Sequence, residues 1–363
     1  MIAKRTIAAT VAVLAAGFFG PAAWSQEPSL AAGPRVTINT ITQTLPTLPQ
    51  YTQVELPIFR ERVPAWSNGR VEFRPSTWAE SGVTGSNILR VVRQGQAEIS
   101  AAPLASVAGD VPFVEIADLA GLSPTIERAR AISAAVVNAS NREMERFGLR
   151  IIGTYVFPAN VIFCRQPLAS LADLAGRKVR TFGPSQNDLV EQLGAQAVSI
   201  AFPEVYGALE RGVADCAVTA ALSGNAAKWF EVTTHMYNLP VSWGIGGYYV
   251  SLRWWNSLDP AVRGFVEQVF KRIEDEQWAL GLNGTADGVA CNIGDASGCR
   301  TGTLVTGARR MTVVEPNDAD RARVQSILQG AVLTNWVRRC GARCGTQFNE
   351  IVAPVVGFRY AGN

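Results

Sequence analysis

One arginine stands where a parallel sheet would present it to a ligand. The stretch 178–181 is predicted to be a short strand, with Gly176 before it and Gly183 after it. Arg180 lies at the end of this strand, where α/β sheets commonly bind their ligands. A guanidinium group there can hold a carboxylate through two parallel hydrogen bonds. The alternative is a surface arginine in an ion pair, and the local sequence leaves both open.

The segments around Arg180 alternate between short strands and short helices. A helix is expected from Ser185, which stands at the N-cap position, to a stop at Gly194. A strand over 197–200 follows, Pro203 opens the next helix, and a third strand covers 216–219. Such alternation indicates an α/β layer with parallel strands.

A similar run of strands and helices covers residues 35–101, and we interpret it as the first of two similar lobes. The end of its first strand, up to Thr42, is polar enough to contact a ligand. The strand over 149–155 is expected to cross between the lobes, and a strand starting at Tyr248 is expected to return.

Three segments of the second lobe occur in a recognisable order and spacing. They are Asp173-Leu174-Ala175-Gly176-Arg177-Lys178-Val179-Arg180, Leu193-Gly194-Ala195, and Phe202-Pro203-Glu204-Val205-Tyr206-Gly207-Ala208-Leu209-Glu210-Arg211-Gly212-Val213-Ala214-Asp215. Together they resemble the signature of the DctP-like family, the solute-binding subunits of tripartite ATP-independent periplasmic (TRAP) transporters. Weaker similarity covers most of residues 35–285.

The resemblance implies an α/β, two-lobed periplasmic binding protein fold, in which each lobe is a mostly parallel sheet flanked by helices. A long helix is expected to brace both lobes. Lobe 1 would comprise 26–152 and about 246–285, and lobe 2 would comprise 153–245 and about 286–363, with the C-terminal helices. The implied function is to capture an organic acid and deliver it to TRAP membrane permease subunits. A periplasmic binding protein that serves a sensor is the alternative.

Family membership would also assign site residues. Arg180 would pair with the substrate carboxylate, and Phe202 would line the pocket, with core packing as its other role. Thr219 stands where a hydrogen-bonding asparagine often stands. Many members carry a second arginine about twenty residues before the first, but this chain has Phe157-Pro158-Ala159-Asn160 there. Since two carboxylates would favour two cations, a monocarboxylate is expected, with Asn160 as a neutral partner.

Four further aromatic residues are expected near strand ends that face the cleft. They favour a ligand with an apolar or aromatic part, although packing accounts for some of them. They are Trp78, Phe182, Trp243 and Tyr248.

The first 25 residues have the composition of a secretory signal, with Lys4 and Arg5 before an apolar run too short to span a bilayer. We expect cleavage before Gln26 and a periplasmic protein that is not membrane-embedded; an uncleaved anchor is the alternative. Without the two leader cations, the net charge of +3 falls to about +1. This balance argues against a nucleic-acid partner.

Six cysteines in an exported chain suggest three disulfides. Cys291 with Cys299 and Cys340 with Cys344 are expected as local pairs, and the remaining Cys164 and Cys216 could bridge two predicted strands, although the sequence leaves all fifteen connectivities open. Metal binding is the rival explanation, but cysteine-rich zinc sites are unusual in exported chains and His235 is the single histidine. No metal or cofactor is therefore expected.

An exported hydrolase is the weaker alternative to a binding protein. Such an enzyme would need a nucleophile with a base and an orienting group, whereas the chain has one histidine and lacks a Gly-x-Ser-x-Gly motif. Gly244-Ile245-Gly246-Gly247 lacks the spacing and the following helix of a dinucleotide-binding loop.

Overall fold

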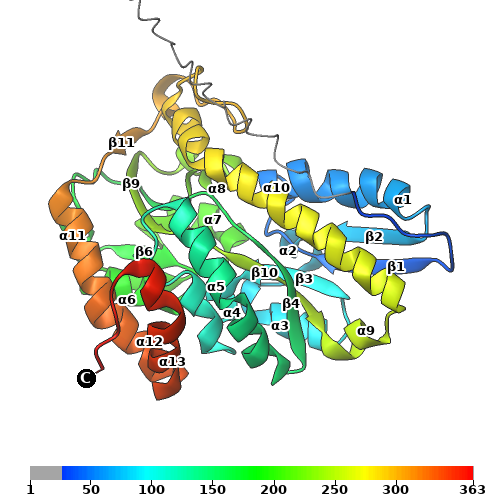
Figure 1. The fold of residues 1–363 in the computed structure, drawn as a ribbon. Helices are drawn as coiled ribbons and strands as arrows, with labels where there is room; N and C mark the ends of the chain where they lie inside the picture. The colour runs from blue at the N-terminus through cyan, green and yellow to red at the C-terminus, as the bar shows by residue number, and fades with distance from the viewer. Residues whose placement is uncertain (1–26, 363) are drawn as a thin grey trace, which may run out of the picture.

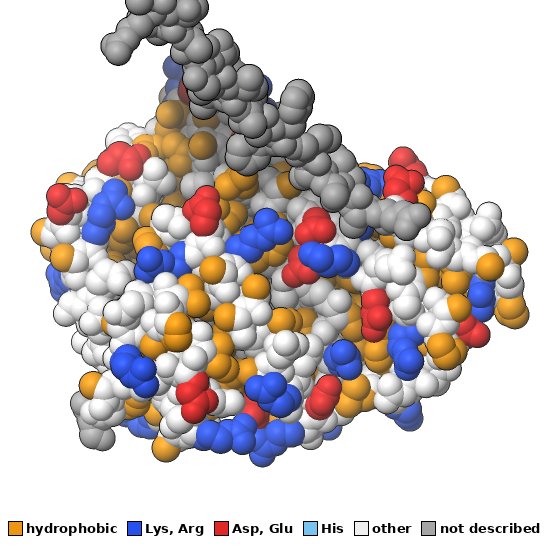
Figure 2. All heavy atoms as spheres, in the orientation of Figure 1, with side chains coloured by type: hydrophobic (Ala, Val, Ile, Leu, Met, Phe, Trp, Pro, Cys, Tyr) orange, Lys and Arg blue, Asp and Glu red, His pale blue; other side chains and the backbone are white. Residues whose placement is uncertain are grey.

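The computed structural model describes residues 27–362, so the expected secretory signal lies outside the described residues. Two mixed β-sheets, each flanked by helices, form two lobes (Figure 1). None of the helices in this part of the chain combines the length and apolar character needed to cross a bilayer. On the face shown in Figure 2, acidic and basic side chains are interspersed, in keeping with the small net charge.

The first sheet has the strand order β2-β1-β3-β10-β4. β1 pairs in parallel with β2 and β3, whereas β10 runs antiparallel between β3 and β4. The strands are β1 (Val36–Ile41), β2 (Val71–Ser76), β3 (Ile99–Pro103), β4 (Leu149–Tyr155) and β10 (Gly246–Ser251). The carboxyl ends of β1 and β3 therefore lie at the same edge of lobe 1.

The second sheet has the order β11-β9-β5-β8-β6-β7. β6 pairs in parallel with β7 and β8, and β5 runs antiparallel to β8 and β9. The strands are β5 (Asn160–Cys164), β6 (Lys178–Thr181), β7 (Gln196–Ser199), β8 (Cys216–Ala220), β9 (His235–Ser242) and β11 (Thr312–Val314). The alternating strands and helices predicted around Arg180 are confirmed.

The helices cover both sheets and continue into a C-terminal group on lobe 2. They are α1 (Val63–Trp66), α2 (Trp78–Ser81), α3 (Ile88–Arg93), α4 (Leu104–Val107), α5 (Ile126–Glu145), α6 (Pro184–Gln192), α7 (Val205–Glu210), α8 (Ala221–Ala226), α9 (Leu252–Ser257), α10 (Pro260–Ile293), α11 (Asp318–Ile327), α12 (Leu333–Cys340), α13 (Ala342–Gln347) and α14 (Ala353–Val356). Wider turns of π type, Gln50–Glu55 and Ile58–Arg62, precede α1.

The start of α6 differs from the sequence prediction. Gly183 occupies the N-cap position and Pro184 the first turn, so Ser185 lies inside the helix. Proline suits the first helical position because its missing N–H has no partner there in any case. Ser185 is instead available to other elements: its backbone N–H donates to Glu115 Oε1 over 2.7 Å, and its hydroxyl accepts from the N–H of Ala120.

The long helix expected to brace both lobes is α10, drawn in yellow across the molecule in Figure 1. Asp259 caps its first turn by accepting from the N–H groups of Ala261 and Val262. Further along, Gly281 and Gly284 press so closely against Val156 and Pro158 that a side chain at either glycine would overlap them. The helix thus packs directly on the segment that leads from β4 to β5.

Two short segments connect the sheets beside α10. Residues 156–159 lead from β4 to β5, and residues 243–245 lead from β9 to β10. They are hydrogen-bonded to each other, since the N–H of Phe157 donates to the carbonyl of Trp243 over 3.1 Å. The exact limits of the two lobes along the chain stay a prediction.

The three disulfides expected from the sequence are present. Cys164 and Cys216 face each other on the antiparallel strands β5 and β8, with a Cα–Cα distance of 4.1 Å. Cys291 near the end of α10 is joined to Cys299, and Cys340 at the end of α12 to Cys344.

Candidate ligand-binding site

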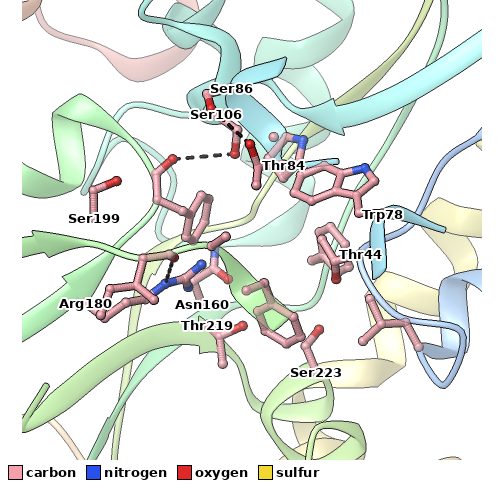
Figure 3. A pocket seen from close by; sticks show the side chains of 18 residues that line it. Thr44, Trp78, Thr84, Ser86, Ser106, Asn160, Arg180, Ser199, Thr219 and Ser223 are labelled. Atoms are coloured by element: carbon pink, nitrogen blue, oxygen red, sulfur yellow. Dashed lines mark hydrogen bonds between the residues drawn. The ribbon is translucent and has the colours of Figure 1, made fainter. Parts of the chain in front are cut away.

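A cavity of about 290 Å³ lies between the two lobes, at the carboxyl ends of their parallel strands (Figure 3). Lobe 1 contributes Thr44, Leu48, Trp78, Thr84, Gly85, Ser86, Pro103 and Ser106. The residues from 157 onward contribute Phe157, Asn160, Arg180, Phe182, Ser199, Ile200, Ala201, Phe202, Thr219 and Ser223. The volume is close to the lower limit of ordinary small-molecule sites.

Arg180 is buried at the carboxyl-terminal half of β6, with only 2% of its surface exposed. Its Nε donates to the carbonyl of Ile200 and its Nη1 to the carbonyl of Val218, each over 2.9 Å. A guanidinium group has five N–H donors, so three remain after these bonds. No carboxylate pairs with Arg180 anywhere in residues 27–362.

The charge of Arg180 is therefore not compensated by any carboxylate of the described residues. Burial lowers its pKa to about 9, which still leaves the group protonated at neutral pH. Among the described residues that line the cavity, it is the single charged side chain. Because a buried cation without a partner is costly, this arrangement favours an anionic ligand with one negative group.

Aromatic rings surround the guanidinium group and form much of the cavity wall. The central guanidinium carbon of Arg180, Cζ, lies 5.3 Å from the centre of the Phe182 ring and 5.8 Å from the centre of the Phe202 ring. On lobe 1, the Trp78 indole is held by a hydrogen bond of 3.0 Å from Nε1 to the carbonyl of Ala101. These fixed rings offer apolar surface to whatever binds Arg180.

Neutral polar groups complete the wall. Asn160 donates from Nδ2 to the hydroxyl of Ser242 over 2.8 Å, which leaves its carbonyl oxygen for the cavity. Thr219 lies at the carboxyl end of β8, and Ser223 lies in the first turn of α8, which follows directly. Both residues are buried. Thr44 provides a hydroxyl from lobe 1.

Six of the nine residues expected at the site line this cavity together. They are Arg180, Phe202, Thr219, Asn160, Trp78 and Phe182. The other lining residues, among them Ser223, Thr44 and Phe157, were missed by sequence reasoning. Ser223 could have been found from the rule that ligands meet the carboxyl ends of parallel strands, since it lies three residues after β8.

Trp243 is not among the lining residues and is held elsewhere. Its indole Nε1 donates to the carbonyl of Ser123 over 2.8 Å, and its backbone N–H donates to Asp118 Oδ1 over the same distance. Asp118 also accepts from the N–H of Ile245. Trp243 and Asp118 therefore fix the connection between β9 and β10, and the expected contact of Trp243 with a ligand stays a prediction.

Thr42 and Tyr248 also lie away from the cavity wall, because both bind Glu55. Tyr248 donates its hydroxyl to Glu55 Oε1 over 2.6 Å, Gln43 donates to the same oxygen over 2.6 Å, and Thr42 donates to Oε2. Glu55 is completely buried, and desolvation raises its pKa to about 7 despite these three bonds. Thr42, directly after β1, and Tyr248, inside β10, thus hold Glu55 within lobe 1, and neither is among the residues that line the cavity.

The family model of DctP, described as bacterial extracellular solute-binding protein, family 7, matches residues 43–283. This range contains every residue that lines the cavity. A solute-binding protein of Albidiferax ferrireducens is 26% identical over 143 residues, which is 39% of this chain and 42% of that protein. The chain spans about half the length of the curated relatives it matches.

Solved structures share the fold at low sequence identity. DctP7 of Bordetella pertussis, an extracytoplasmic solute receptor binding pyroglutamic acid, has a TM-score of 0.76 and 18% identity, covering 89% of this chain and 100% of that chain. A TRAP periplasmic solute binding protein from Desulfovibrio salexigens with bound orotic acid has a TM-score of 0.75 and 18% identity, covering 88% and 99%. The two-lobed fold expected from the sequence is confirmed.

Proposed function

Since this chain belongs to family 7 of the bacterial extracellular solute-binding proteins, we propose that it captures a small monocarboxylate between its two lobes. We further propose that it passes this acid to the membrane subunits of a TRAP-type transporter. The observation that carries the proposal is the uncompensated charge of Arg180 inside a cavity shared by both lobes. The role is binding, without chemical conversion of the acid.

The composition of the wall supports a ligand with one carboxylate. A second carboxylate would need a second cation, and the lining residues within 27–362 offer only Arg180. The rings of Phe182, Phe202 and Trp78 favour an apolar or aromatic body next to the carboxylate. Pyroglutamate and orotate, the acids bound by the two structural neighbours, are small cyclic monocarboxylates and are suitable first probes.

We place the protein in the periplasm. The family is described as extracellular, and three disulfides are typical of an oxidising compartment. Delivery to a permease follows from the TRAP resemblance of residues 173–215.

Thermal unfolding against a panel of organic acids tests the function. An acid at about a hundred times its dissociation constant stabilises the folded state by roughly 2.7 kcal/mol, which raises the unfolding temperature by several degrees. Arg180→Ala should lose this shift. Lys178→Ala, which removes an exposed cation from the same strand, should retain it. An unchanged shift in Arg180→Ala would refute the assignment of Arg180, and no shift with any carboxylate would refute the function.

A further inference from the structure

Ser223 carries a buried hydroxyl whose partner is missing. It lies in the first turn of α8, is 3% exposed, and lines the cavity. Its Oγ makes no hydrogen bond with any residue in the described range 27–362. Because an unsatisfied buried hydroxyl destabilises a fold, this group is expected to meet a polar atom that the protein alone does not supply.

A second hydroxyl faces the same part of the cavity from the other lobe. Thr44, 7% exposed, also lines the cavity, and no hydrogen bond of its side chain is formed within residues 27–362. Figure 3 shows Arg180 on one side of the cavity and both Ser223 and Thr44 on the other, with Thr219 between. The cavity therefore has a cationic end and a neutral hydroxyl end.

We propose that Ser223 and Thr44 form a polar subsite that binds a hydroxyl, carbonyl or amide group of the ligand, at the end away from its carboxylate. The inference rests on the proposed function and narrows it. A hydroxyl group both donates and accepts, so the subsite accommodates either kind of polar atom. The ligand class is then a small monocarboxylate with a distal polar group, and unsubstituted aliphatic or aromatic acids bind less well.

The apolar wall and the polar subsite act together. Leu48 and Trp78 line the cavity from lobe 1 and are both buried, and a hydrogen bond strengthens when water is excluded. An acid without the distal group leaves Ser223 as unpaired as it is in the empty protein. Sites that hydrogen-bond a substrate group discriminate strongly against analogues that lack it, for this reason.

Matched pairs of acids test the subsite by isothermal titration calorimetry. The pairs are pyroglutamate with cyclopentanecarboxylate, 4-hydroxybutanoate with pentanoate, and 4-hydroxybenzoate with benzoate. For the pair of best size, the polar acid should bind wild-type protein at least tenfold more tightly than its apolar partner. Ser223→Ala should weaken the polar acid about tenfold and leave the apolar acid unchanged, which reduces the ratio towards one.

Ser140→Ala is the matched control, because the Ser140 hydroxyl in α5 is also buried and unpaired within residues 27–362, but Ser140 does not line the cavity. It should leave the ratio of the two affinities as it is in the wild type. If apolar acids bind as tightly as polar ones while Arg180→Ala abolishes both, the subsite is refuted and the carboxylate function stands. If Ser223→Ala weakens both members equally, the serine only shapes the cavity. Failure of all six acids, together with no thermal shift from any carboxylate of the panel, would refute subsite and function together.

Discussion

Gly183 and Ala105 meet across the boundary between the lobes, so closely that a methyl group on Gly183 would lie 2.5 Å from the Cβ of Ala105. Gly183 has a φ of −156°, an extended conformation that any residue can adopt. Glycine is thus required at position 183 because a larger side chain would overlap Ala105 of the other lobe, and not because of its backbone conformation. Beside it, the hydroxyl of Ser106 donates to the carbonyl of Phe182 over 3.5 Å.

Gly183→Ala is therefore expected to hinder closure of the cleft while the fold is kept. The dissociation constant of any carboxylate that binds should rise at least tenfold, because the added methyl overlaps Ala105. Calorimetry gives the affinity, and small-angle X-ray scattering gives the compaction on binding, which the variant should lack.

Two further variants make this expectation specific. Ala105→Gly combined with Gly183→Ala should recover much of the affinity, because the overlapping Cβ is removed. Gly109→Ala adds a methyl group that meets nothing within 4 Å and should bind like the wild type. Wild-type affinity in Gly183→Ala alone would show that the contact does not limit closure.

Arg180→Lys tests whether charge alone suffices at the cationic end. Lysine keeps the positive charge but cannot hold Ile200 and Val218 through a planar fork while presenting further parallel donors. We expect carboxylate affinity to fall at least tenfold, measured by calorimetry, with a small change in the unfolding temperature of the empty protein. If the lysine variant binds the carboxylate as tightly as the wild type does, the planar arrangement of donors in the guanidinium group contributes nothing to the affinity.

Glu55 should make stability depend on pH. Burial raises its pKa from the ordinary value of 4.5 to about 7 in the folded state, so the folded protein keeps a proton that the unfolded chain loses. The free energy of unfolding should therefore fall as pH rises from about 4.5 to about 7. Above that range, Glu55 should not contribute to the dependence of the free energy of unfolding on pH. The decrease in the free energy of unfolding that is due to Glu55 amounts to roughly 3 kcal/mol over this range.

Glu55→Gln isolates this contribution. Urea unfolding at several pH values should show a smaller decline for the variant than for the wild type. Burial also raises the pKa of Asp118 to about 7, and this residue makes stability depend on pH in both proteins. The contribution of Glu55 is therefore the difference between the wild type and the variant in how the free energy of unfolding changes with pH. If the free energy of unfolding falls equally with pH in both proteins, Glu55 is not the group responsible.

The disulfides should differ in their effect on stability. Cys164 and Cys216 are 52 residues apart, whereas Cys340 and Cys344 are 4 apart. Loop-closure entropy predicts a loss of about 4 kcal/mol for Cys164→Ala/Cys216→Ala and about 2 kcal/mol for Cys340→Ala/Cys344→Ala. Urea unfolding of the two double variants measures the difference, and a larger loss for the short loop would contradict this order.

Sequence reasoning placed Arg180 correctly at a strand end because glycines flank its strand and the motif spacing fixes the register. It failed for Tyr248, which it took to face the cleft. Residues along a strand alternate between the faces of a sheet, and the sequence does not state which face Tyr248 joins. In the structure its ring packs on Phe270 of α10, with ring centres 4.8 Å apart.

Ser223 and Ser185 show a second limit of sequence reasoning. Whether a hydroxyl caps a helix, binds a neighbour or stays unpaired depends on elements far away in the chain. Ser185 is bound by Ala120 and Glu115, whereas Ser223 has no partner in the described residues. Local preferences are alike for both serines, so only the assembled lobes separate their roles.

The hydrogen bond between Phe157 and Trp243 couples the two connecting segments into one ribbon. In two-lobed proteins that close by a hinge, a few residues in such connecting segments absorb the change in backbone angles. Phe157 also forms part of the cavity wall. An acid that packs against its ring therefore contacts one of the two connecting segments directly, so that the binding site and the connection between the lobes share a residue.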